Sequence, residues 1–216
     1  MKFNLIDLEK YERKEHFIHY LKNVPCSYSM TVNIDITELQ KLLKEKHYKL
    51  YPVILYAITR VTNNHIEFRM CLDEKEKLGY YNIVNPTYTI FHKENNTFSS
   101  IWTEYNENFT EFLNNYEKDI QEYENKQGFI TKECKENNLI NISAIPWESF
   151  TGFNLNLPKG EGYLLPIFTT GKFFEENKRV LLPLSVQVHH AVCDGFHTSR
   201  FINELQELLN NFNNVV

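Results

Sequence analysis

The sequence has no excess of basic residues, no long hydrophobic run and no closely spaced cysteines. Its formal net charge is −5, and its lysines are dispersed among acids, which argues against binding to the phosphate backbone of nucleic acid. The opening residues MKFNLIDLEKYERKEHF are charged throughout, unlike a signal peptide, and no apolar run approaches the ~20 residues that span a bilayer. We therefore expect a cytoplasmic protein that binds neither nucleic acid nor a membrane.

Cysteines are few and far apart, at Cys26, Cys71, Cys134 and Cys193. Because no two of them form a C-x-x-C pair, their spacing indicates neither a zinc site nor a disulfide framework. We expect reduced thiols and no metal.

What the chain does contain is enough hydrophobic material for one core. At 216 residues, 42% of them hydrophobic, it is long enough for one sizeable core and short for two. No repeat period and no Gly/Ser linker divides it, so we expect a single domain over residues 1–216. Helix and strand signals alternate, which favours an α/β or α+β domain whose helices cover a sheet.

Periodic patterns predict the individual elements. Helices are predicted at 11–21, 38–46, 53–65, 107–125 and 201–209, the last two from apolar residues at helical spacing. Pro52 suits the first turn of the third helix, and Thr37 with Gln40 would form a capping box for the second. Short runs of β-branched and aromatic residues predict strands at 26–36, 88–92, 97–105, 141–147, 152–157, 163–170 and 180–190, with a hairpin between the second and third. The polar stretch 126–138 is expected to be a loop.

The motif HHAVCDG at 189–195 ends the last predicted strand. Side chains alternate across a strand, so His190 shares a face with Leu184 and Val188, while His189 points the other way. Burial disfavours the imidazolium, so a histidine on this apolar face would stay neutral at pH 7 and could accept a proton, as a general base must. For a lone histidine, however, a hydrogen-bonded core position is the more frequent explanation.

Asp194 and Gly195 follow the histidines in the same motif. Glycine can take backbone angles closed to other residues, which fits a sharp bend before the closing helix. A buried aspartate needs a partner, and an arginine from elsewhere in the chain would pair with it through two hydrogen bonds. We therefore expect Asp194 to hold the turn rather than to transfer protons.

Other interpretations of the motif are weaker. His189, His190 and Asp194 could bind a metal, but adjacent strand residues point in opposite directions and cannot readily chelate one ion. Cys193 could be a nucleophile, but sequence adjacency alone does not position a base to activate it, and a small buried thiol is the simpler interpretation.

The motifs together resemble those of the chloramphenicol acetyltransferase family. The similarity runs from Tyr11 to Leu209 and includes HHAVCDGFH with the upstream LPLSVQV, NISAIPW, FNLNL, YSMTVNIDIT, YTIFH, TFSSIW and NELQELL. The dihydrolipoamide acyltransferases share only the short motif and carry lipoyl and tethering segments, and the condensation domains of peptide synthetases are much larger. The resemblance implies a two-layer α/β (α+β) sandwich, with a mixed β-sheet covered by helices, of the CoA-dependent acyltransferase type.

The resemblance also implies a reaction and its residues. Acetyl would pass directly from acetyl-CoA to the 3-hydroxyl of chloramphenicol, without an acyl-enzyme and without a metal, and would confer resistance. The family base falls on His190, and the oxyanion donor falls on Ser143. Thr169 would hold a water near the same intermediate. On spacing alone, neither hydroxyl would be assigned a function.

Further family positions fall on this chain. The arginine that pairs with Asp194 falls on Arg13. The family is homotrimeric with its site between subunits, so the implied partners are chloramphenicol, acetyl-CoA and further copies of the chain. Positions that line the antibiotic pocket fall on residues for which core packing is a second explanation: Tyr20, Cys26, Phe98, Leu155 and Ile167.

The chain departs from the family at Phe173, where a tyrosine is frequent, and at His19, where some relatives have an aromatic residue. Three other functions stay open on the residues themselves: an acetyltransferase for another hydroxylated acceptor, a protein that binds the antibiotic without reaction, and a metal-dependent hydrolase.

Overall fold

The computed structural model describes residues 2–157 and 162–216, so residue 1 and residues 158–161 of the predicted domain lie outside the described part. The helices are α1 Lys14–Ile18, α2 Thr37–Lys46, α3 Leu50–Asn64, α4 Phe109–Tyr123 and α5 Gly195–Asn210, with a π-helical turn at His19–Asn23 and 3₁₀ turns at Ile66–Arg69 and Phe212–Asn214. The strands are β1 Phe3–Leu5, β2 Ser27–Asp35, β3 Met70–Leu72, β4 Leu78–Tyr81, β5 Asn85–His92, β6 Thr97–Trp102, β7 Leu139–Ala144, β8 Ile167–Thr170, β9 Phe174–Glu176 and β10 Arg179–His189.

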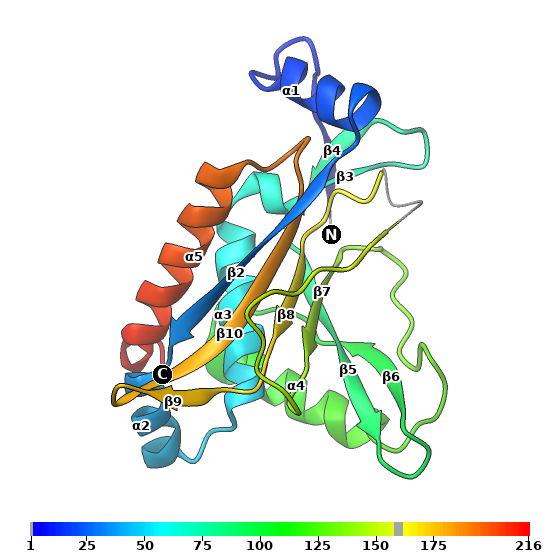
Figure 1. Cartoon of the computed structure of the whole chain (residues 1–216). Coiled ribbons are helices and arrows are strands. Elements are labelled where there is room, and N and C mark those ends of the chain that lie inside the picture. Colours follow the sequence, from blue (N-terminus) through cyan, green and yellow to red (C-terminus); the bar gives the residue numbers. More distant parts are fainter. Residues whose placement is uncertain (1, 158–161) are drawn as a thin grey trace.

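A large mixed sheet forms the centre of the molecule (Figure 1). Within the described residues its strand order is β2-β10-β8-β7-β5-β6, and β9 also pairs with β10. Strand β7 runs parallel to both β5 and β8, whereas β10 runs antiparallel to β2, β8 and β9. A smaller antiparallel sheet, β1-β4-β3, stands beside it.

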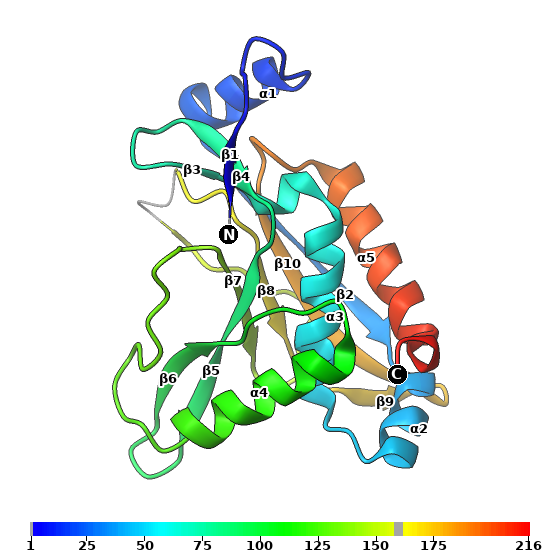
Figure 2. The same cartoon turned by 180° about the vertical axis from the view of Figure 1, so that it is seen from behind.

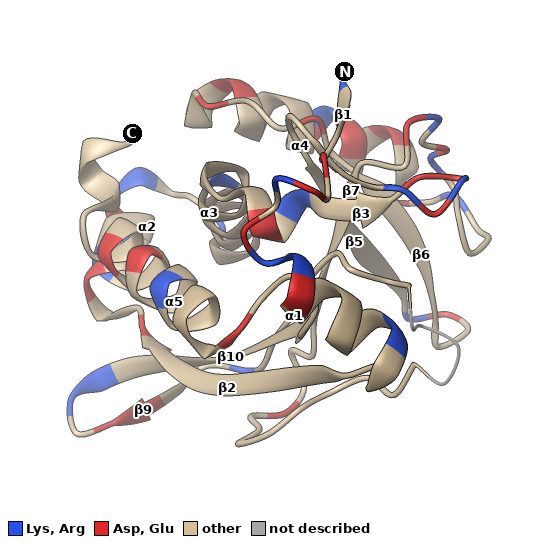
Figure 3. Ribbon diagram, turned by 90° about the horizontal axis from the view of Figure 1, so that it is seen from above, with Lys and Arg blue, Asp and Glu red and all other residues tan. Residues whose placement is uncertain are grey.

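Helices α3, α4 and α5 cover one face of the large sheet (Figure 2). Seen from above, they form one layer with α2 while β2 and β10 lie in the other (Figure 3). Alternate residues of β10, such as Leu184, Val186 and Val188, point into the core between the layers and are almost fully buried. Burial of such apolar surface is the main favourable term in folding. The predicted mixed sheet covered by helices is therefore confirmed.

The opposite face of β10 is polar but also buried. Ser185 donates its hydroxyl to the Phe153 carbonyl at 2.6 Å. The side-chain amide of Gln187 bonds both the N–H and the C=O of Leu155, at 2.7 and 2.9 Å. The prediction of a strand at 152–157 is wrong, because this backbone pairs with side chains of β10 and not with a neighbouring strand.

Two other local predictions also need correction. The capping box at Thr37 is wrong, since α2 begins at Thr37 itself with Ile36 at the N-cap. The Thr37 hydroxyl bonds Asp35 and accepts from the Val180 N–H at 2.9 Å, so it joins α2 to β10 instead. The first helix is shorter than the predicted 11–21, because a π-helical turn follows α1 from His19 onwards.

Among the described residues, no helix combines the length and the apolar character needed to cross a bilayer.

Candidate active site

The turn after β10 fixes the orientation of His190. Strand β10 ends at His189, and the His190 N–H still donates to the Cys26 carbonyl at 2.8 Å. The ring nitrogen Nδ1 of His190 lies 3.1 Å from the Cys193 carbonyl oxygen. Because a carbonyl can only accept, Nδ1 carries the proton in this contact, and in the neutral ring the lone pair is left on Nε2. The turn thus prepares Nε2 to accept a proton.

Aromatic rings enclose the same imidazole. The ring of Tyr20, from the π-helical turn, stacks on His190 with centroids 3.9 Å apart, and Tyr28 of β2 meets it edge-on at 5.4 Å. His190 is half-buried rather than part of the apolar core face that strand alternation predicts, because the strand ends one residue before it. The ring is therefore held in place by the two aromatic side chains and not by burial in the core.

Asp194 caps helix α5 and forms an ion pair with Arg13. Its carboxylate accepts from the Phe196 N–H at 3.0 Å and from Arg13 Nη1 at 2.7 Å, and lies 2.8 Å from His197 Nδ1. Partial burial raises the pKa of Asp194, but the hydrogen bond from Arg13 and the neighbouring His197 outweigh it and lower the pKa to about 2. The aspartate is therefore ionised at neutral pH. Its arginine partner is Arg13, as expected, but the pair is joined by one hydrogen bond and not by the two that were predicted.

The pairing of Arg13 with Asp194 joins two distant parts of the chain. Arg13 stands at the N-cap of α1, next to the turn that carries Tyr20, while Asp194 stands at the N-cap of α5. The ion pair is partly exposed, with 21% and 33% of the two side chains accessible. It links the segment that stacks on His190 to the turn that bears His190.

The environment of Cys193 does not suit a nucleophile. Burial raises the pKa of the Cys193 thiol well above its usual value, so the thiol stays protonated at neutral pH, and a thiolate is the form that attacks. Within residues 2–157 and 162–216, no three His, Cys, Asp or Glu side chains are grouped so that they could hold a metal ion.

Ser143 and Thr169 form a second group of predicted residues. They are directly opposite each other on the parallel strands β7 and β8, and Thr169 in turn pairs with Ser185 of β10. Thr169 is buried, whereas Ser143 lines a cavity of about 540 Å³ at the ends of β7 and β8. Phe98 of β6 lines the same cavity, and most of its wall is apolar or aromatic, including Phe91, Trp147 and Phe173.

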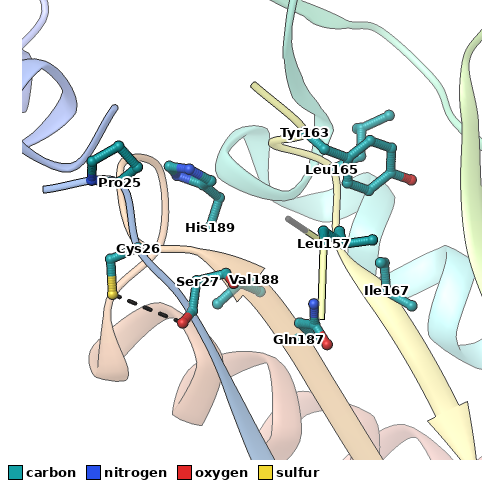
Figure 4. Close-up of a pocket in the computed structure, with 10 residues that line it drawn as sticks. All are labelled: Pro25, Cys26, Ser27, Leu157, Tyr163, Leu165, Ile167, Gln187, Val188 and His189. Atoms are coloured by element: carbon teal, nitrogen blue, oxygen red, sulfur yellow. Dashed lines mark hydrogen bonds between the residues drawn. The ribbon is translucent and has the colours of Figure 1, made fainter. Parts of the chain in front are cut away.

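The remaining predicted residues line two hollows nearer the turn. Cys26 and Ile167 face a small hollow of about 80 Å³ beside His189 (Figure 4). Its walls come from the start of β2, the end of β10 and the segment that leads to β8. Leu155 lines an adjacent polar hollow of about 490 Å³ against β2 and Gln187.

Within one chain the two groups of residues are well separated. Ser143, Thr169 and Ser185 lie in one row across the sheet, and His190 comes five residues after Ser185. Five residues of strand span about 16 Å. A single protomer therefore brings Arg13, Tyr20, Cys26, His190 and Asp194 together at one place and Phe98, Ser143 and Thr169 at another.

Sequence reasoning missed several side chains of this site. The Tyr28 hydroxyl lies 2.7 Å from the Thr198 hydroxyl beside His190, and burial raises the pKa of Tyr28 to about 12, so that it stays protonated. His197 and Gln187 were also missed. For His197 a signal existed, because it stands three residues after the N-cap aspartate, where a capping partner is expected.

The fold shows the class of protein to which the chain belongs. A solved dihydrolipoamide acetyltransferase of Azotobacter vinelandii superimposes with a TM-score of 0.60 at 17% identity, over 88% of this chain and 84% of that one. The chain therefore has the CoA-dependent acyltransferase fold. A solved chloramphenicol acetyltransferase matches far better, with a TM-score of 0.88 at 26% identity over 96% of this chain and 100% of that one.

The sequence comparisons narrow the class to a family. The profile described as "Chloramphenicol acetyltransferase" matches residues 1–206. Proteins of that name from Clostridium perfringens and Vibrio anguillarum are 58% and 52% identical, over 98% and 99% of this chain and 97% of each relative. The chain belongs to the chloramphenicol acetyltransferase family, which confirms the resemblance in the motifs.

Proposed function

We propose that this protein is an acetyltransferase that passes acetyl from acetyl-CoA to the 3-hydroxyl of chloramphenicol and so confers resistance to that antibiotic, acting in the cytoplasm where the acyl donor is made. Its membership of the family supports the substrates. The observation that carries the mechanism is the contact of His190 Nδ1 with the Cys193 carbonyl, which leaves Nε2 free to act as a base.

In the proposed reaction, His190 Nε2 takes the proton of the 3-hydroxyl as its oxygen attacks the thioester carbonyl. The tetrahedral intermediate carries an oxyanion, to which the Ser143 hydroxyl donates a hydrogen bond, and Thr169 holds a water close by. Collapse of the intermediate breaks the carbon–sulfur bond, and the CoA sulfur leaves with the proton from His190. The thioester is already activated, so a base and an oxyanion donor are sufficient.

The proposal assigns positioning and binding roles to the other residues. Arg13 and Asp194 hold the turn that orients His190, as their ion pair across the fold supports. The cavity beside Ser143, with its aromatic wall and Phe98 among its lining residues, suits the antibiotic. Five residues would contact the antibiotic: Tyr20, Cys26, Phe98, Leu155 and Ile167.

The spacing of the two groups supports a site shared between copies of the chain. A general base must lie within about 3 Å of the proton it takes, and the oxyanion donor within about 3 Å of the developing charge on the adjacent carbonyl. His190 and Ser143 of one chain, about 16 Å apart along the strand direction alone, cannot both reach one intermediate. We therefore propose a homotrimer in which His190 of one copy faces Ser143 of its neighbour.

Release of free CoA thiol tests the function directly. Purified protein is mixed with acetyl-CoA and chloramphenicol, thiol appearance is followed with a chromogenic disulfide, and the product is identified by mass spectrometry. We expect thiol release that depends on the antibiotic, and none with the 3-O-acetylated antibiotic as the matched acceptor.

Three results would contradict the proposal. Antibiotic binding without thiol release would indicate a sequestering protein. Thiol release only with another hydroxylated compound would indicate a different acceptor. Loss of activity on treatment with a chelator, restored by a divalent metal, would indicate metal-dependent chemistry.

A further inference from the structure

The polar segment 126–133, which follows α4, runs along the outer edge of β6 (Figure 2). The Ser100 N–H donates to the Phe129 carbonyl at 2.6 Å, and the Thr131 N–H donates to the Ser100 carbonyl at 3.3 Å. The segment thus adds a short parallel bridge to the edge of the large sheet. None of residues 124–137 is buried, so apolar packing contributes little to holding this stretch.

Ser99 provides the first polar anchor of the segment. Its hydroxyl is completely buried and lies 3.0 Å from the Lys126 carbonyl and 2.7 Å from the Gly128 carbonyl. His92 Nε2 lies 2.7 Å from the same hydroxyl oxygen. Because the serine donates its proton to a carbonyl, His92 is the donor in the other bond.

Lys132 provides the second anchor. Its ammonium group donates to Asp119 of α4 at 2.6 Å and to the Trp102 carbonyl at 2.9 Å, and it lies 4.2 Å from the centre of the Trp102 ring. The other carboxylate oxygen of Asp119 accepts from the Thr103 hydroxyl at 2.8 Å. Only 17% and 12% of the Lys132 and Asp119 side chains are exposed, so this ion pair is largely shielded from water.

Between the two anchors the segment carries Phe129. Its ring meets the ring of Phe98 edge-on, with centroids 5.9 Å apart. Phe98 lines the cavity that contains Ser143, yet its side chain is 49% exposed, and Phe129 is 66% exposed. Since neither ring is enclosed by the core, each depends on the other and on the attachment of the segment for its orientation.

We propose that Lys132 and Asp119 are positioning residues for the acceptor: their buried ion pair holds segment 126–133 on β6, and through Phe129 it sets the Phe98 ring that the antibiotic contacts. This inference rests on the proposed function. It predicts that breaking the ion pair between Lys132 and Asp119 weakens acceptor binding and leaves the binding of acetyl-CoA unchanged.

Paired charge variants separate positioning from stability. Lys132→Met leaves the Asp119 carboxylate without its cationic partner in a site largely shielded from water, so the protein should unfold at a lower temperature. We expect the KM for chloramphenicol to rise roughly tenfold, with the KM for acetyl-CoA unchanged, as displacement of a binding group predicts. The double variant Lys132→Met/Asp119→Asn carries no unpaired charge, so it should regain most of the thermal stability while keeping the raised KM.

Lys126→Met is the matched control, because it removes an exposed ion pair, that of Lys126 with Glu122, at the start of the same segment and leaves the Lys126 carbonyl in place. It should change neither KM nor stability. The inference is overturned if the acceptor KM of the double variant returns to the wild-type value along with the stability, or if both KM values rise together.

The inference about Lys132 and Asp119 can be tested even if the proposed acetyl transfer does not occur. If the wild-type protein binds chloramphenicol but transfers no acetyl, calorimetric dissociation constants for the antibiotic replace KM, and the same pattern across the variants supports the inference. A wild-type protein that does not bind the antibiotic overturns it.

Discussion

The tautomer of His190 decides which of its nitrogens can act as a base. The Cys193 carbonyl holds the proton on Nδ1, and the stacked Tyr20 ring holds the plane of the imidazole. The geometry is set by the turn itself and by the segment that Arg13 ties to it. The orientation of His190 is thus set by contacts within the protein, before any acceptor binds.

His190→Ala should remove this base and leave the fold intact. General base catalysis contributes roughly a hundredfold or more to a rate, so we expect kcat for acetyl transfer to fall at least that far. The measurement is initial-rate thiol release, with the thermal unfolding midpoint as the control for folding. Turnover close to that of the wild type would show that another group takes the proton.

The pairing of Asp194 with Arg13 predicts a specific dependence of stability on pH. The pKa of Asp194 is lowered from 3.8 to about 2 in the folded protein, so the folded state binds fewer protons there than the unfolded state. Its contribution to the free energy of unfolding is complete above pH 4 and is lost as the pH falls through 2.

Urea unfolding of the wild type and of Asp194→Asn across this range measures that contribution. The difference between the two proteins should shrink as the pH falls from about 4 to about 2. A difference that stays constant through this window would mean that the Asp194 carboxylate does not gain stability from its ion pair with Arg13.

At the scale of elements, β10 makes different contacts on the two faces of the large sheet. Its apolar residues face the helices, while Ser185 and Gln187 hold the irregular segment 153–155 through the backbone atoms of that segment. A buried polar side chain of this kind replaces the ladder hydrogen bonds that a strand would provide. Among the described residues, the segment that bears Leu155 is therefore attached to the sheet through hydrogen bonds from side chains.

Gln187→Met should release this segment. We expect faster proteolysis within 151–157 and a severalfold rise in the KM for chloramphenicol, because Leu155 is a proposed acceptor contact. Gln206→Met is the matched control, since the Gln206 amide bonds the N–H and C=O of Asp35 in the same way at a place remote from the cavities. Equal effects of the two variants on KM would argue against a specific role for Gln187.

The comparison of sequence and structure is clearest at this scale. Long elements with strong patterns, such as α4, β2 and β10, were predicted within a few residues, because each has one periodic apolar face. The last helix was predicted only from Phe201, whereas α5 begins six residues earlier, at Gly195. The strands β1, β3, β4 and β9 were not predicted, because three or four residues are too few to display a period. Segment 152–157 was predicted as a strand because its alternation matches one, although its partners are side chains.

At the scale of the whole molecule, the distance between His190 and Ser143 predicts complementation between inactive variants. Ser143→Ala should lower kcat with little change in KM, since its bond forms mainly in the transition state. If each site joins His190 of one copy to Ser143 of the next, a trimer assembled from His190→Ala and Ser143→Ala chains has one intact site.

Co-expression of the two variants with different affinity tags tests this arrangement. The mixed species, purified through both tags, should show about one third of the activity of a wild-type trimer, whereas each parent shows almost none. No recovery in a mixed trimer would place both residues of each site within a single copy.

By itself, the sequence determined the family and the type of sheet, because those depend on residue types at fixed spacings along the chain; the residues of the site remain a prediction. Only the tertiary structure decided which nitrogen of His190 is free, what holds segments 126–133 and 153–155, and that His190 and Ser143 of one chain lie far apart. The physical reason is that hydrogen-bond partners such as Leu155 and Gln187, 32 residues apart, are chosen by folding and leave no local pattern in the sequence.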